Sequence, residues 1–434
     1  MAIEAAVEPL YLFGVPVDFI LFGATLAGVA TFHRKALRVA LLGLAAITLY
    51  KLTFTGFKFG AGLPGLGAHM AHEWVILANL FLLLTGFALL ARHFETSNVP
   101  EAMPAILPDD WKGGFALLAI VCVLSSLLDN IASALIGGTM AKHVFKGNVH
   151  IGFLAAIVAA SNAGGAGSVL GDTTTTMMWI HGVSPLLVFE AYVASAVALV
   201  IFGIPAALKQ HAHSPIARDP APGTKIEWTR LGIVLVILLA AIAANIVSNI
   251  HYPALLAEIP VIGLAVWVAL LLTALVRKPD WGILRPAFLG SVFLLALVTA
   301  ASMMPVEKLP EASWHAALGL GFVSAVFDNI PLTALALKQG GYDWGFLAFA
   351  VGFGGSMIWF GSSAGVALAN AFPEARSASN WIRHGWYVVP AYVVGFFVML
   401  SILGWSADHP GHARVAETPP STTAITASDI SVKP

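Results

Sequence analysis

Long apolar segments alternate with short polar connections along most of this chain. Ten of the segments are long enough to cross the hydrocarbon core of a bilayer as helices. They lie at residues 16–32, 38–54, 74–92, 150–180, 185–207, 230–249, 260–276, 286–304, 345–372 and 386–405. The pattern therefore predicts an all-α polytopic membrane protein with ten transmembrane helices, five in each half.

Two further apolar runs, 114–142 and 313–338, carry an Asp-Asn pair near the middle. Irregular backbone at membrane depth is stable only where it is buried in protein or faces a water-filled cavity. We therefore predict two re-entrant hairpins with tips at 129–130 and 328–329, and Pro331 suits such a tip. A spanning helix with the pair inside it is the alternative.

A glycine-rich interruption follows each Asp-Asn pair. Without gaps, Gly164, Gly165 and Gly171 align with Gly354, Gly355 and Gly361, and hydroxyl residues follow the last glycine in both copies. The chain is thus predicted to be an internal duplication, each half with one hairpin and one broken helix (about 150–180 and 345–372). Five spans per half place the halves in opposite senses, as an inverted repeat.

The predicted repeats cover residues 1–207 and 230–405. The proline-containing stretch 208–229 is expected to be a cytoplasmic linker, and residues 406–434 a disordered tail. Most of the 22 lysines and arginines fall in connections that become cytoplasmic if both termini lie outside. This orientation suits a multi-pass protein of a bacterial inner membrane.

Composition supports the membrane assignment and narrows the function. The chain is 58% hydrophobic and 10% charged, with a mean hydropathy of +0.85, which excludes a soluble domain. A net charge of −1 and scattered basic residues argue against nucleic acid as a partner. The single Cys122 permits no intramolecular disulfide, and no basic segment precedes the first apolar run, so we expect no cleaved signal peptide.

The polar residues near the breaks are candidates for a cation site. Broken helices leave backbone carbonyls free, and a hard monovalent cation prefers oxygen ligands. Such oxygens come from Asp129, Asn130, Asp172, Thr173, Thr174, Asp328, Asn329, Ser362 and Ser363. We predict Na⁺ at Asp129, Asp172 and Asp328, because we expect no Lys or Arg to pair with them. The alternative is that the hydroxyls and amides only cap helix ends.

A second polar cluster, His69, His72 and Glu73, lies at the outer start of the third span. Its spacing places the three side chains on one helix face, where they could sense pH. An interfacial cluster without function is the alternative, and a zinc site lacks a further ligand. The glycines from Gly165 to Gly171 do not follow a βαβ pattern, which argues against a dinucleotide loop.

Over residues 16–405 the chain resembles the ion transporter superfamily, and within it the NhaD-type sodium/proton antiporters. The resemblance lies in Ala160-Ser161-Asn162-Ala163-Gly164-Gly165-Ala166, Gly171-Asp172-Thr173-Thr174-Thr175, Asp328-Asn329-Ile330-Pro331-Leu332 and Gly361-Ser362-Ser363-Ala364-Gly365. It implies a homodimer. It also implies transport roles for Asp129, Asn162, Asp172, Thr174, Thr175, Ser324, Asn329, Ser362 and Ser363. Ile131-Ala132-Ser133-Ala134 replaces the family's threonines after the first Asp-Asn, and Val169 replaces its usual proline.

The leading hypothesis is an antiporter, with no cofactor and no enzyme activity, that exchanges cytoplasmic Na⁺ or Li⁺ for external H⁺ by alternating access. Cations and protons would compete for the same carboxylates. The alternative is a sodium-coupled importer of di- or tricarboxylates, and a metalloid anion exporter is a third hypothesis. Anions favour hydroxyls, amides and helix N-termini, so three acidic residues argue against both. A membrane-embedded enzyme finds support only in the His69 cluster.

Overall fold

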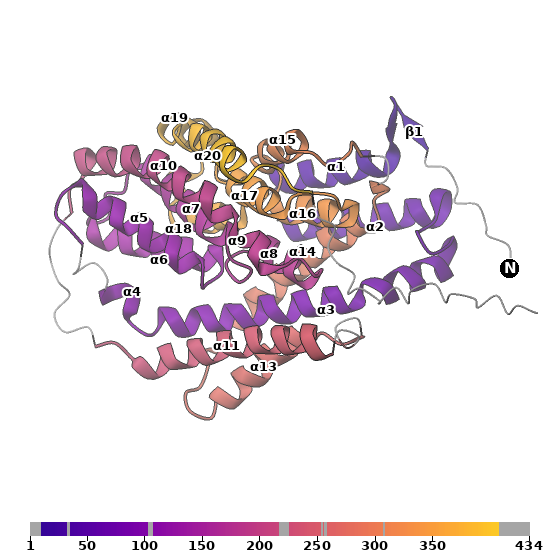
Figure 1. Cartoon of the computed structure of the whole chain (residues 1–434), viewed down its shortest axis with the longest axis horizontal. Coiled ribbons are helices and arrows are strands. Elements are labelled where there is room, and N and C mark those ends of the chain that lie inside the picture. The colour runs from indigo at the N-terminus through magenta and orange to yellow at the C-terminus, as the bar shows by residue number, and fades with distance from the viewer. Residues whose placement is uncertain are drawn as a thin grey trace, which may run out of the picture.

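The computed structural model describes residues 10–32, 35–102, 107–216, 225–252, 255, 258–306 and 309–407. Nearly all of these residues that form regular structure are helical, as Figure 1 shows. Within them, strand structure is confined to a small antiparallel hairpin of β1 (Tyr11–Leu12) and β2 (Val15–Pro16). The prediction of a helical protein is therefore confirmed for the described part of the chain.

The first half of the chain has helices at the predicted apolar runs, but α3 begins at Gly62, well before the predicted run 74–92. Its helices are α1 (Val17–Thr31), α2 (Ala36–Tyr50), the π-helix η2 (Lys51–Thr55), α3 (Gly62–Glu95), α4 (Val99–Ala102), α5 (Trp111–Ser125), α6 (Asn130–Val144), α7 (Ile151–Ala166), α8 (Thr173–Ile180), α9 (Pro185–Phe189) and α10 (Ala191–His213). Both 114–142 and 150–180 are divided into two helices, and the divisions fall at the polar sequences.

The second half repeats this order. Its elements are α11 (Trp228–His251), α13 (Val261–Thr273), η4 (Trp281–Ile283), α14 (Leu284–Ser302), α15 (Trp314–Ser324), α16 (Asn329–Gln339), α17 (Trp344–Gly354), α18 (Ser363–Ala371), η6 (Pro373–Ala375), α19 (Ala378–His384) and α20 (Val388–Leu403). Because α10 continues to His213, the helix extends into the predicted linker. Linker residues 217–224 and tail residues 408–434 lie outside the described residues.

Five described helices are long and apolar enough to cross a bilayer, and a sixth span results if α19 and α20, which meet at a 60° bend, count as one. The five are Ala36–Thr55, Gly62–Glu95, Pro185–His213, Trp228–Ser248 and Trp281–Ser302. Other apolar helices, including α5, α7 and α17, are shorter. The glycine-rich interruptions shorten α7 and α17, because each predicted span is built from two half-length helices. The fold is that of a helical membrane protein.

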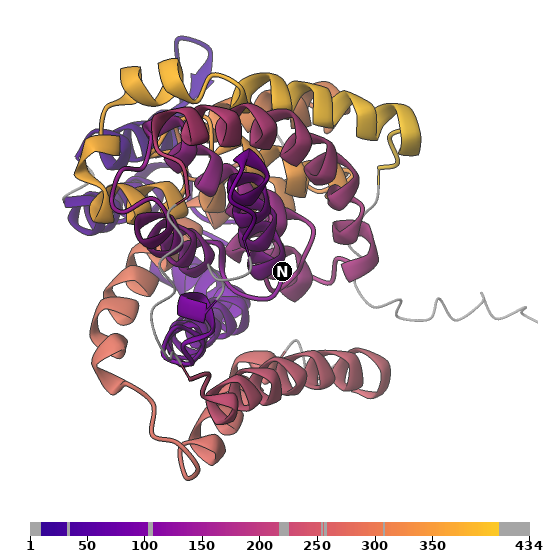
Figure 2. The same cartoon turned by 90° about the vertical axis from the view of Figure 1, so that its left-hand side faces the viewer.

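The helices form two packed groups. In the first, α7 and α17 contact each other and are buried along nearly their whole length, with α5 against α7, α15 against α17 and α10 against α20. In the second, α3 packs against α11, α13 and α14. Figures 1 and 2 both show α3 between α11 and the first group. The broken helices therefore lie in the most buried part of the molecule.

Candidate functional site

Both Asp-Asn pairs lie where one helix ends and the next begins. Asp129 caps the N-terminus of α6, and its Oδ1 accepts a hydrogen bond of 2.8 Å from the Ile131 N–H. Asp328 caps α16 in the same way, accepting from the Ile330 N–H at 3.0 Å. A carboxylate at this position binds free N–H groups and the positive end of the helix dipole. No single continuous helix runs through either pair, because each pair lies between two helices.

The two interruptions are built alike. Asp172 caps α8, where its Oδ1 accepts from the Thr174 N–H at 3.0 Å, and Ser362 caps α18 by accepting from the Gly365 N–H at 3.2 Å. A Cβ on Gly165 would lie 2.6 Å from the carbonyl oxygen of Gly171, and one on Gly355 would lie 2.8 Å from that of Gly361. Glycine is needed at both positions because the broken ends approach this closely.

One carboxylate joins the two Asp-Asn pairs. Asp172 Oδ2 accepts from Asn130 Nδ2 at 3.0 Å and from Asn329 Nδ2 at 3.3 Å. Asp172 is only 2% exposed, so both bonds are shielded from water. Asp172 and Asn329 are 157 positions apart in the sequence, so this carboxylate joins residues of opposite halves.

Asn162, which lies four residues before the end of α7, extends this network to the second interruption. Its Oδ1 accepts from Asn130 Nδ2 at 3.0 Å, and its Nδ2 donates to Ser356 Oγ at 2.9 Å and Ser362 Oγ at 3.1 Å. Ser356 is not among the site residues predicted from the sequence. It follows the glycine pair Gly354-Gly355 and aligns with Ala166, and this polar difference between the two copies could have identified it.

The remaining predicted oxygens differ in the groups that they contact. Ser363 Oγ donates to Asp328 Oδ2 at 3.0 Å, so it lies on a candidate ligand. The hydroxyl of Thr175 donates to the carbonyl of Ser168 at 2.6 Å, and that of Ser324 donates to the carbonyl of Val351 at 2.7 Å. These two hydroxyls therefore stabilise the backbone near the interruptions. The Thr174 hydroxyl is buried and has no hydrogen-bond partner among the described residues.

A cavity of about 240 Å³ reaches the first Asp-Asn pair from between α3, α6, α8 and α14. Asp129 and Thr173 contribute to its lining from the site, and Arg92 and Glu95 contribute from the C-terminal end of α3. Arg92 is ion-paired with Glu95 and with Asp280, both at 3.1 Å. The cavity thus connects a candidate cation ligand to the end of α3 that is predicted to be cytoplasmic.

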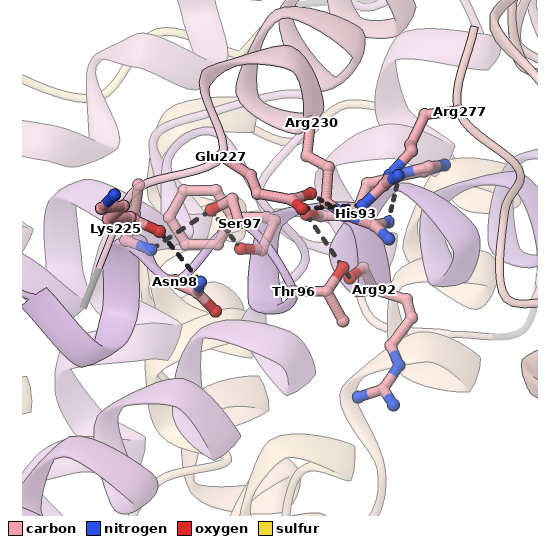
Figure 3. Close-up of polar contacts among 11 residues, drawn as sticks. Arg92, His93, Thr96, Ser97, Asn98, Lys225, Glu227, Arg230 and Arg277 are labelled. Atoms are coloured by element: carbon pink, nitrogen blue, oxygen red, sulfur yellow. Dashed lines mark hydrogen bonds and ion pairs between the residues drawn. The ribbon is translucent and has the colours of Figure 1, made fainter. Parts of the chain in front are cut away.

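A polar cluster next to this end of α3 ties three elements together (Figure 3). Glu227 accepts from Arg230 and from Arg277, both at 2.7 Å, and Arg230 lies 3.2 Å from Nδ1 of His93. Figure 3 also shows Asn98, whose amide donates to the Lys225 carbonyl. These contacts hold the C-terminal end of α3 against the start of α11 and the segment after α13.

The predicted pH-sensing cluster lies at the opposite end of α3. His69 and Arg92 are separated by about 35 Å along the helix, at 1.5 Å per residue. His69 is buried, and its Nε2 lies 3.0 Å from Ser302 Oγ at the end of α14. His72 packs its ring against Phe59. No group of three metal-ligating side chains occurs among the residues that the structure describes.

Sequence comparison finds several related transporters, although no family model matches the chain. The chain is 29% identical over 321 residues to sodium/proton antiporter 1 of Arabidopsis thaliana, which covers 63% of this chain and 52% of that protein. It is 29% identical over 319 residues to sodium/proton antiporter 2 of the same plant, covering 62% and 71%. The Na⁺/H⁺ antiporter NhaD of Vibrio parahaemolyticus is 26% identical over 357 residues, covering 68% and 80%.

These matches confirm the resemblance predicted from the motifs to NhaD-type sodium/proton antiporters. The aligned part of the chain spans about half the length of sodium/proton antiporter 1.

Proposed function

We propose that this chain, a helical membrane protein similar to NhaD-type antiporters, exchanges Na⁺ or Li⁺ for H⁺ by alternating access. The observation that carries the proposal is the double hydrogen bond to Asp172, which accepts from Asn130 and Asn329 of opposite halves. A buried carboxylate at the junction of two broken helices is typical of a site for a cation or a proton.

The arrangement of the amides supplies oxygen ligands. Because Asn130 and Asn329 both direct Nδ2 to Asp172, their Oδ1 atoms are left for other partners. Asp129 and Asp328 lie next to these amides in the chain, and the interruptions provide backbone carbonyls. Carboxylate, amide and carbonyl oxygens are the ligands that hard monovalent cations prefer. We therefore assign Na⁺ ligation to the two Asp-Asn tips and to Asp172.

Matching contacts in the two halves support an inverted repeat of ten spans. Helix α5 packs on α7 as α15 packs on α17, and α6 packs on α18 as α16 packs on α8. The second helix of each predicted hairpin thus contacts the interruption of the other half. Five spans per half would give the halves opposite orientations and leave both termini outside.

A difference between the halves supports alternating access. Helix α16 packs against α14, and Lys338 of α16 donates to the carbonyl of Met304 just beyond α14. At the equivalent place in the first half, the cavity separates much of α6 from α3. The site is thus open toward the Arg92 end of α3 and closed on the opposite side. We interpret this arrangement as the cytoplasm-facing state.

Coupling to protons would follow from competition. A carboxylate without access to bulk water binds a proton more readily, and a protonated carboxylate no longer attracts Na⁺. Binding of Na⁺ at the site would then release a proton, and binding of a proton would release Na⁺. This competition is enough to couple Na⁺ transport to H⁺ transport, provided that the empty, unprotonated site does not switch between facing the two sides of the membrane.

The deciding experiment uses everted membrane vesicles with an acidified lumen. We expect NaCl or LiCl to dissipate the pH gradient, and citrate to leave it unchanged. Labelled succinate or citrate taken up with Na⁺, without proton release, would instead establish the carboxylate importer. Vesicles from cells without the protein provide the baseline.

A further inference from the structure

We propose that the cavity between α3, α6, α8 and α14 binds an organic monocation with an apolar body, and that Asp129 binds its charged group. The inference goes beyond inorganic cations, and rests on the proposed function only in that Na⁺ would share Asp129. The ligand class follows from the charge and the walls of the cavity.

The walls are apolar over most of their length. On α3 the lining runs from Leu80 to Glu95, which corresponds to about 22 Å along the helix. Leu83, Leu84 and Phe87 face the cavity from this helix, and further aliphatic residues line it from α6 and α14. A volume of about 240 Å³ accommodates a ring or a short alkyl chain. Such walls favour a ligand that removes its own apolar surface from water.

Two hydroxyl groups on the walls are already occupied. The hydroxyl of Thr176 donates to the carbonyls of Val169 and Asp172, and that of Ser291 donates to the carbonyl of Ala287. A bare Na⁺ therefore gains few oxygen ligands along the cavity. An organic cation needs none there, because its apolar part contacts the walls directly.

The charge of Asp129 completes the site. Its Oδ1 accepts from the Ile131 N–H, and the structure shows no ion pair to this carboxylate within the described residues. At the other end of the cavity, Arg92 is neutralised by Glu95 and Asp280. Asp129 thus places a carboxylate without a cationic partner among the described residues at this end of the cavity, and an amidinium or ammonium group would neutralise it through charge-assisted hydrogen bonds.

The test is equilibrium binding of benzamidine to the purified full-length protein, with benzamide as the neutral compound of the same shape. We expect benzamidine to bind at least tenfold more tightly than benzamide, and Na⁺ to weaken its binding. Para-alkyl benzamidines should bind about fourfold more tightly for each added methylene until the cavity is filled. Asp129→Asn should weaken benzamidine binding at least tenfold.

Asp328→Asn is the matched control, because Asp328 occupies the equivalent cap in the second half but does not line this cavity. It should retain benzamidine binding. Equal binding of benzamide and benzamidine, or unchanged affinity in Asp129→Asn, would overturn the proposal and identify the cavity as a site for lipid chains. Benzamidine binding that depends on Asp129 but is insensitive to Na⁺, in a protein without exchange activity, would contradict the proposed function alone.

Discussion

The helix breaks in the two halves of this protein have nearly the same backbone conformation but differ in the charge of one capping residue. Asp129 and Asp328 cap their helices with nearly the same dihedral angles, φ −53° and ψ 143° against φ −52° and ψ 138°. At the interruptions, however, the cap is Asp172 in the first half and Ser362 in the second. The helix breaks are therefore alike in the two halves, while the acidic cap at the glycine-rich interruption occurs in the first half alone.

This asymmetry arises because the two Asp-Asn tips meet at the same residue, Asp172. Because Asp172 accepts from both Asn130 and Asn329, one carboxylate serves both halves. A further carboxylate at position 362 would lie near Asn162, in a buried network, and would add the cost of burying another charge. A serine accepts the Asn162 amide and caps α18 without that cost.

We expect the largest effect from replacing Asp172, the acidic N-cap residue of α8. Asp172→Asn should reduce Na⁺-driven proton movement at least a hundredfold, because the site loses its shared charge, while the protein remains folded in the membrane. Initial rates in everted vesicles measure this effect. Asp110→Asn, which removes an exposed carboxylate cap from α5, is the control and should retain activity. Exchange by Asp172→Asn near the normal rate would place the essential charge at Asp129 or Asp328.

Replacing the side chains of Asn130 and Asn329 one at a time would show how much each half contributes to the site. Asn130 donates to both Asn162 and Asp172, whereas Asn329 has one longer bond to Asp172. A hydrogen bond to a charged group contributes about 1.5–3 kcal/mol. We expect Asn130→Ala to raise the Na⁺ concentration for half-maximal exchange roughly 10- to 100-fold, and Asn329→Ala to raise it less. Equal losses would show that the halves contribute equally.

The pH response tests whether the carboxylates bind both ions. Apparent Na⁺ affinity should fall as pH drops, by up to about tenfold per pH unit if one proton is displaced, because a protonated carboxylate carries no charge. Exchange rates measured from pH 6 to 9 at several Na⁺ concentrations test this dependence. If His69 and His72 sense pH, replacing both with Gln should flatten the profile without abolishing exchange at high pH. An Na⁺ affinity independent of pH would contradict competition.

The smallest expected effect concerns the closed side of the molecule. Lys338→Met removes the contact with the Met304 carbonyl, and so should favour opening between α14 and α16. We expect about a fivefold shift of the conformational equilibrium, which corresponds to about 1 kcal/mol. A single cysteine at Ala287, introduced with Cys122→Ala, reports on the cavity through its rate of labelling. Lys142→Met is the control, and unchanged labelling in Lys338→Met would show that the contact does not stabilise this state.

The positions of the helices, of their breaks and of their caps follow from the amino-acid sequence. Apolar runs predicted the helices, and the Asp-Asn pairs and glycines predicted where they break, because caps and turns depend on residues within one helical turn. The caps at Asp129, Asp172, Asp328 and Ser362 form bonds to residues two or three positions away. The likeness of the two halves is visible in the sequence for the same reason, since both halves contain these local signals.

Which of these polar groups meet depends on the long-range packing of the helices. The contact of Asn329 with Asp172 and that of Asn162 with Ser356 join residues 157 and 194 positions apart. Such contacts depend on how α7, α17 and the two predicted hairpins pack, and no local pattern encodes this. The same holds for the cavity at Asp129, because identical helix caps in both halves are compatible with either side being open. The residue types and helix caps of the site thus depend on local sequence. The meeting of these residues and the opening of the cavity at Asp129 depend on long-range packing.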